Sequence, residues 1–224
     1  MGRLRVVVAV GACAVAMTVA GAAGAVSLRK SPELLKNPGA ESGFCDTTHW
    51  ELGAAAAILP SIFARCGNVT VAPFRNRAYT DSDVPDKGQK FSHRLFTGNN
   101  EDGDISQKCM NQSIYMGREP ALSFIHSPHP KYTLSAWLGV AGEEDKDDVY
   151  GKVCFYNDEF ERVGCAQIAI NGPTQDRLHH KSTTGTLPRS AIYAVVAFEL
   201  DEDDDKPQGR NRAAFDNASF TLSG

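Results

Sequence analysis

The closing stretch of the chain, Phe215–Leu222, constrains the fold more than any other segment. Its alternation predicts a β-strand with one core-directed row, made of Asp216, Ala218, Phe220 and Leu222. A carboxylate in such a row requires a partner, because a buried charge without compensation costs several kcal/mol. The opening motif Asn37–Gly43 supplies a second carboxylate, Glu41, and a shared Ca²⁺ is one remedy; hydrogen bonds to Asp216 are the alternative. We therefore expect the first and last stretches of the mature chain to lie side by side.

The first 25 residues have the pattern of a secretory signal peptide. Two arginines precede an apolar run from Val6 to Ala20, and Ala23-Gly24-Ala25 offers the small residues after which signal peptidase cuts. An uncleaved anchor is the alternative, because small and apolar residues continue to Val26. We expect cleavage and secretion to the extracellular space, with one domain over residues 26–224 and no membrane attachment afterwards.

The charge of the chain argues against one class of partner. The formal net charge is −4 at pH 7, and removal of Arg3 and Arg5 with the signal makes it more acidic. A protein that binds nucleic acid usually carries a basic patch or stripe, and the sequence contains no such run. We therefore expect no nucleic-acid partner.

Cysteines in an exported chain are expected to form disulfides. Cys154 and Cys165 flank Asn157–Phe160, which has the composition of a hairpin turn, so the two cysteines should face each other across an antiparallel pair.

The remaining cysteines are odd in number once Cys13 leaves with the signal. Cys45 and Cys66 form the second expected pair. Cys109 is then left over, either as a free thiol or as a bond to another chain.

Short extended segments separated by Gly, Pro, Asn and Asp predict an all-β chain. The expected strands are residues 68–74, 90–96, 109–116, 131–140, 148–156, 164–170, 192–200 and 213–222. An antiparallel β-sandwich or jelly roll is favoured, because parallel α/β units would need helices between the strands. The alanine-rich stretch Glu51–Ala64 is expected to be a short helix or a buried irregular loop.

An ordered series of motifs runs along the chain. They are Leu34–Gly43, Gln112–Ile114, Tyr132–Gly139, Asn157–Glu161, Thr184–Pro188 and Ala214–Phe220. The series resembles the galactose-binding-like jelly rolls found as carbohydrate-binding modules in secreted proteins, and it covers most of residues 33–223. The resemblance implies a structural calcium shared by Glu41 and Asp216. The sequence departs from the family at Thr47–Trp50, where such domains usually have Pro-Gly-Trp.

Binding of a sugar without covalent chemistry requires an aromatic face and a few polar groups. Alternation in Tyr132–Leu138 directs Thr133, Ser135 and Trp137 away from the apolar face, so Trp137 is either a stacking platform or is packed under a neighbouring segment. Further aromatic candidates for ligand binding are Tyr79, Phe91 and Tyr115.

Motifs for catalysis are missing from the sequence, which contains no nucleophile elbow, zinc-protease motif, phosphate-binding loop or dinucleotide fingerprint. We therefore expect a non-enzymatic protein that recognises a glycan or polysaccharide. The alternative is an extracellular structural or adhesion protein with the same fold and no sugar site. Sequons at Asn68, Asn111 and Asn217 would make it a glycoprotein in a host that glycosylates.

Overall fold

The computed structural model describes residues 29–36, 49–52, 67–73, 94–98, 107–140, 147–174, 177–201 and 213–224. These residues form strands and one short helix. The elements are β1 (Glu51–Leu52), β2 (Gly67–Asn68), β3 (Thr70–Pro73), β4 (Arg94–Thr97), β5 (Gln107–Tyr115), α1 (Leu122–Ile125), β6 (Lys131–Val140), β7 (Asp148–Tyr156), β8 (Arg162–Asn171), β9 (His179–Thr186), β10 (Tyr193–Asp201) and β11 (Ala213–Ser223).

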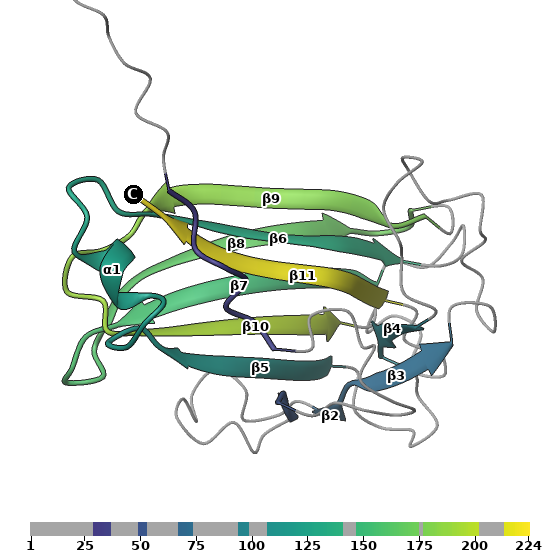
Figure 1. Ribbon diagram of the computed structural model, residues 1–224. Coiled ribbons are helices and arrows are strands. Elements are labelled where there is room, and N and C mark those ends of the chain that lie inside the picture. Colours follow the sequence, from purple (N-terminus) through teal and green to yellow (C-terminus); the bar gives the residue numbers. More distant parts are fainter. Residues whose placement is uncertain are drawn as a thin grey trace, which may run out of the picture.

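The strands form two layered sheets (Figure 1). The first sheet has the order β1-β5-β10-β7-β8, and β2 also pairs with β5, in parallel. The second sheet has the order β3-β4-β11-β6-β9 and is antiparallel throughout. The chain is therefore an all-β sandwich of the jelly-roll type, as its sequence predicts.

The core lies between the sheets because strand alternation directs every second side chain inward. In β6 the inward row is Tyr132, Leu134, Ala136, Leu138 and Val140, and the five are buried. At one end of the core, Phe198 stacks on Phe215 with ring centroids 4.0 Å apart. Trp50 is 6% exposed and packs edge-on against these rings.

Strand β11 departs from the simple alternation that its sequence predicts. A bulge falls between Asp216 and Ser219, and Asn217 has a φ of 46°, in the left-handed region. The extra residue reverses the faces, so that Phe215 and Ala218 both point into the core while Asp216 pairs with Trp137 on the outer face. The expected core-directed row is therefore confirmed for Ala218, Phe220 and Leu222. It is wrong for Asp216, which is nonetheless fully buried.

The opening segment 29–36 runs beside β11, as expected of the first and last stretches (Figure 1). Lys30 forms a bridge with Ser223, and the Leu34 amide donates to the Phe220 carbonyl at 3.0 Å. A carboxylate joins the two stretches, since Glu33 Oε1 accepts from the Phe220 amide at 2.8 Å. Residues 37–43, which carry Glu41, lie outside the described residues.

Besides its bonds to β11, the opening segment is hydrogen-bonded to Gln112 on β5. The Gln112 side chain donates to the Lys36 carbonyl at 2.5 Å and accepts from the Lys36 amide at 3.0 Å. The opening segment is thus bonded to both sheets.

The predicted strand bounds agree with β6 and β7 at both ends and with most of β5, β8, β10 and β11. Strand β9 was not expected. In the stretch Glu51–Ala64, residues Glu51 and Leu52 are strand β1 and the remainder lies outside the described residues. In the described part of the chain, no helix has the length and apolarity needed to cross a membrane.

The disulfide between Cys154 and Cys165 is confirmed, with the two residues directly paired between β7 and β8. Cys109 is also disulfide-bonded, and it is 1% exposed. The expectation that Cys109 is left over for another chain is therefore wrong, because a buried and bonded sulfur is not accessible to a partner. Cys45 and Cys66 lie outside the described residues.

Candidate functional site

Three aromatic side chains gather at one end of the first sheet, on its outer face. Tyr115 ends β5, and Tyr193, its direct cross-strand partner, begins β10. Phe160 comes from the β7–β8 hairpin and stacks on Tyr193 with centroids 5.0 Å apart and an interplanar angle of 23°. The Tyr115 and Tyr193 rings are 5.2 Å apart. We call Tyr115, Phe160 and Tyr193 the aromatic cluster.

Two of the three rings of the cluster are exposed, and the third, Tyr193, is half-buried. Phe160 is 54% and Tyr115 is 46% exposed, and they are the large hydrophobic residues recorded as exposed among those the structure describes. Single exposed apolar residues are common on protein surfaces, but contiguous exposed rings indicate an interaction surface.

The hairpin turn holds Phe160 in an unfavourable backbone conformation. Its φ is 60°, a region that costs about 1–2 kcal/mol for a residue with a side chain. The turn is fixed by Asn157, whose Oδ1 accepts from the Glu161 amide at 2.8 Å and whose Nδ2 donates to the Glu161 carboxylate at 3.1 Å. Because Phe160 is strained and exposed, its ring contributes little to folding, and strain of this kind is typical of functional positions.

Polar groups surround the cluster. The Arg118 guanidinium carbon lies 5.7 Å from the centroid of the Tyr115 ring, a cation–π distance. Ser113, two residues before Tyr115 on the same face of β5, is exposed. The guanidinium and the hydroxyl are groups that hydrogen-bond to ligand hydroxyls.

The support beneath the cluster is rigid. Tyr156 pairs with Tyr193 on the other side of β10 and is 4% exposed. The Cys154–Cys165 disulfide lies in the adjacent row of the same face and joins the strands that carry Phe160. The cluster therefore stands on paired strands rather than on a loop alone.

Trp137 lies on the outer face of the second sheet, as alternation predicts, but it is not exposed. It is 8% exposed and packs in a small cluster with Leu95, Leu178 and Ala214. Its ring centroid is 5.2 Å from that of His180. The interpretation of Trp137 as an open stacking platform is wrong, because these neighbours cover the indole.

The expected calcium ligands remain untested. Asp216 is fully buried, and its Oδ1 accepts from the Asn217 amide at 2.7 Å, while Glu41 lies outside the described residues. Within the described ranges, no group of three or more His, Cys, Asp or Glu side chains could hold a metal ion.

Other predicted residues fall in different places. Tyr79 and Phe91 lie outside the described residues. Tyr115 is in the aromatic cluster. The sequon residue Asn111 is 2% exposed, so the folded chain could not carry a glycan there.

The sequence did not identify Phe160 or Tyr193. A signal was present for Phe160, since this phenylalanine follows Asn157-Asp158-Glu159 in a predicted turn and is flanked along the chain by charged residues. Tyr193 could not be placed without the register that brings β10 next to β5.

Comparisons with known proteins give the fold. No protein-family model matches the sequence, and no curated protein matches it. The enzymatically active domain of tailspike protein 4 from bacteriophage CBA120 is similar in structure, with a TM-score of 0.51, 14% identity and 84% of this chain covered. The chain spans about a fifth of that tailspike chain, since the match covers 21% of it.

Two complete modules are also among the similar structures. The family 61 carbohydrate-binding module TmCBM61, solved with β-1,4-galactotriose, has a TM-score of 0.44 and 13% identity over 85% of this chain and 98% of its own. The CBM22-1 xylan-binding domain of Paenibacillus barcinonensis Xyn10C has a TM-score of 0.43 and 15% identity over 86% and 95%. The similar structures are mainly carbohydrate-binding modules. The jelly-roll fold of this chain rests on its own two sheets and their strand order.

Proposed function

We propose that this protein is a secreted, non-catalytic glycan-binding protein whose ligand stacks on the aromatic cluster. The observation that carries the proposal is the exposed Phe160 ring, held in a strained turn and stacked on Tyr193.

The aromatic cluster and the polar groups beside it match the two kinds of surface on a sugar ring. Pyranose rings present an apolar C–H face, which packs on aromatic rings, and a rim of hydroxyls, which need hydrogen bonds. The cluster offers adjacent rings, and Arg118 and Ser113 lie beside it. Since the rings sit on an open sheet face, an extended saccharide chain suits them better than a small enclosed ligand does.

Binding can be tested by affinity electrophoresis of the secreted protein in gels that contain galactan, xylan or a mixed-linkage β-glucan. Phe160→Asn is the most informative change, because asparagine tolerates a positive φ and has no aromatic ring. We expect retention on the binding polysaccharide to weaken about tenfold, while unfolding becomes harder by about 1 kcal/mol as strain is relieved.

Tyr115→Ala should weaken retention similarly without unfolding the protein. Trp137→Phe is the matched control, since it alters an aromatic residue on the other sheet and keeps the site packed. Loss of retention in Trp137→Phe alone would place the sugar on the second sheet. No retention of the parent protein by any polysaccharide would favour the alternative, an adhesion or structural role without a sugar site.

A further inference from the structure

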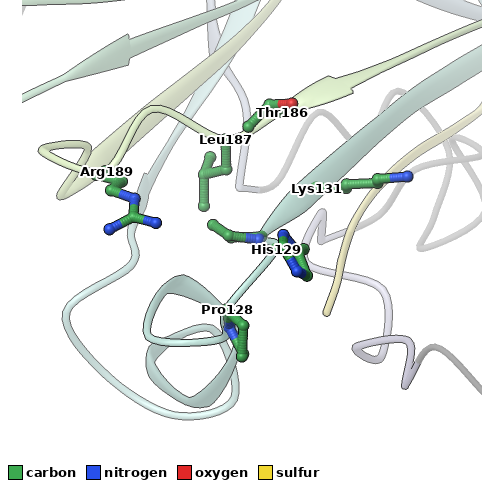
Figure 2. Close-up of a pocket in the computed structure, with 7 residues that line it drawn as sticks. Pro128, His129, Lys131, Thr186, Leu187 and Arg189 are labelled. Carbon is green, nitrogen blue, oxygen red and sulfur yellow. The ribbon is translucent and has the colours of Figure 1, made fainter. Parts of the chain in front are cut away.

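A second surface, separate from the aromatic cluster, has a different chemistry. A cavity of about 430 Å³ opens at the end of the second sheet, where β6 begins and β9 ends, and Figure 2 shows its lining. That volume is within the range of small-molecule pockets, roughly 300–1,000 Å³. The lining residues are Pro128, His129, Pro130, Lys131, Thr186, Leu187 and Arg189.

The floor of the cavity is apolar and its rim is cationic. Leu187 is 1% exposed and Pro130 is buried, whereas His129, Lys131 and Arg189 are exposed. In Figure 2, Lys131 and Arg189 lie on opposite sides of Leu187 and His129. No acidic side chain is among the lining residues, so the rim cations are not neutralised from within the cavity.

The basic character extends from the cavity across the sheet. Lys30 pairs with Ser223, Ser223 with Lys131, and Lys131 with Thr186, so the four residues form one cross-strand row on one face. Neighbouring strands are about 4.8 Å apart, which puts the backbones of Lys30 and Lys131 roughly 10 Å from each other. Lys30 is exposed as well. A chain whose net charge is −4 thus has two lysines in one cross-strand row that ends at a pocket.

The backbone that carries the rim is fixed. The Leu187 amide donates to the Pro130 carbonyl at 2.9 Å, and the Ala191 amide donates to the Pro188 carbonyl at 3.0 Å, which closes a turn around Arg189. Glu33, the acidic residue of the opening segment, is engaged by the amides of Leu35 and Phe220 at 2.9 and 2.8 Å.

We propose that this cavity binds an acidic sugar residue, whose carboxylate or sulfate pairs with a cation of the rim, Arg189 or Lys131, and whose ring packs against Leu187 and the flanking prolines. Guanidinium and ammonium groups bind such oxyanions through charge-assisted hydrogen bonds, and the Thr186 hydroxyl is placed for a ring hydroxyl. The assignment of a saccharide rests on the proposed glycan-binding function, whereas the preference for an anion rests on the cavity alone.

The test titrates isotope-labelled protein with glucuronate, glucose 6-sulfate, glucose and inorganic sulfate, and follows the backbone amides by NMR. We expect glucuronate and glucose 6-sulfate to shift the amides of Lys131, Thr186, Leu187 and Arg189, and to bind less well as salt is raised. Glucose should bind far more weakly, because it lacks the anionic group. Inorganic sulfate should also bind more weakly than either acidic sugar, because it lacks the ring.

The double variant Lys131→Gln/Arg189→Gln should bind glucuronate roughly tenfold more weakly, since exposed cations contribute modestly to the binding of an anion. Its matched control is Arg177→Gln/Lys181→Gln, which removes the same charges from just before β9 and from its first half, away from the cavity, and should bind as the parent does. Equal binding by the two double variants would overturn the anion site.

Two further results would overturn the sugar assignment. If inorganic sulfate bound as tightly as glucuronate, the sugar ring would contribute nothing to binding. If a short single-stranded oligonucleotide displaced glucuronate more strongly than an acidic polysaccharide did, the ligand would be nucleic acid. The two proposals can be rejected independently. Retention on neutral polysaccharides without glucuronate binding rejects the cavity site alone. Glucuronate binding without retention on neutral polysaccharides rejects the aromatic cluster alone.

Discussion

Tyr150, on the outer face of β7, has a phenol whose ionisation is strongly disfavoured. Its hydroxyl donates to Asp148 Oδ2 at 2.6 Å. That hydrogen bond, followed by burial and the negative charges of Asp148, Asp201 and Glu199, raises the pKa of Tyr150 to about 12 from 10.0. Because the folded-state pKa is raised, the stabilisation is complete below about pH 10 and is lost as the pH rises toward the folded-state value.

We therefore expect Tyr150→Phe to flatten the alkaline limb of the stability profile. Melting temperatures measured between about pH 9 and 12 should fall more steeply for the parent than for the variant. Tyr132 and Tyr156, whose pKa values are also raised by burial, are present in both proteins and contribute equally. Parallel curves would show that the Asp148 hydrogen bond is absent in solution.

Asp216 and Glu41 are the residues on which the predicted calcium site depends. If Glu41 and Asp216 share a Ca²⁺ ion, calcium at a hundred times its Kd should stabilise the parent by about 2.7 kcal/mol, and Asp216→Asn or Glu41→Gln should abolish the gain. The measurement is a melting curve with calcium and with a chelator, and magnesium serves as the control ion. Coincident curves for the parent would leave Asp216 as a buried hydrogen-bonded carboxylate only.

The bulge in strand β11 can be tested by comparing alanine and glycine at position 217. Asn217 adopts a φ of 46°, which glycine and asparagine adopt more readily than a residue with a plain Cβ does. We expect Asn217→Ala to lower the free energy of unfolding by about 1 kcal/mol and Asn217→Gly to change it by less. Urea denaturation of the two variants measures both values. An alanine variant as stable as the glycine variant would mean that the strand can lose its bulge.

Some strands could be predicted from the sequence and others could not. Strand β7 and the first half of β6 alternate between buried and less buried residues, and the bounds of both strands could be predicted. Strand β9 could not, since it lies at the edge of its sheet and its sequence His179–Thr186 has no apolar row. The predicted face is wrong for Asp216 alone, because the bulge changes the alternation at this point and its one marker in the sequence is Asn217.

For the whole molecule, the strand pattern was sufficient for the fold class but not for the site. Tyr115 could be named as an aromatic candidate, yet its partners come from β10 and the β7–β8 hairpin, which only the register brings together. Trp137 was placed on the correct face, but its exposure depends on Leu95 and Leu178, which come from distant parts of the chain.

Export is a property of the whole chain, and we expect the secreted form to begin at Val26. Expression in a secreting host, followed by intact-mass measurement of the medium, gives the cleavage site. A mass that includes residues 1–25, or protein found only in the membrane fraction, would instead support the uncleaved anchor.

The pairing of the opening segment with β11 has a consequence for anything attached to this domain. Arg29 accepts a hydrogen bond from the Gly224 amide at 3.1 Å, so the two ends of the described chain meet. Polypeptide joined at either end would emerge from a single corner of the sandwich. Two appended modules would be neighbours of each other whatever their order in the gene, and a short loop across that corner would close the chain into a ring.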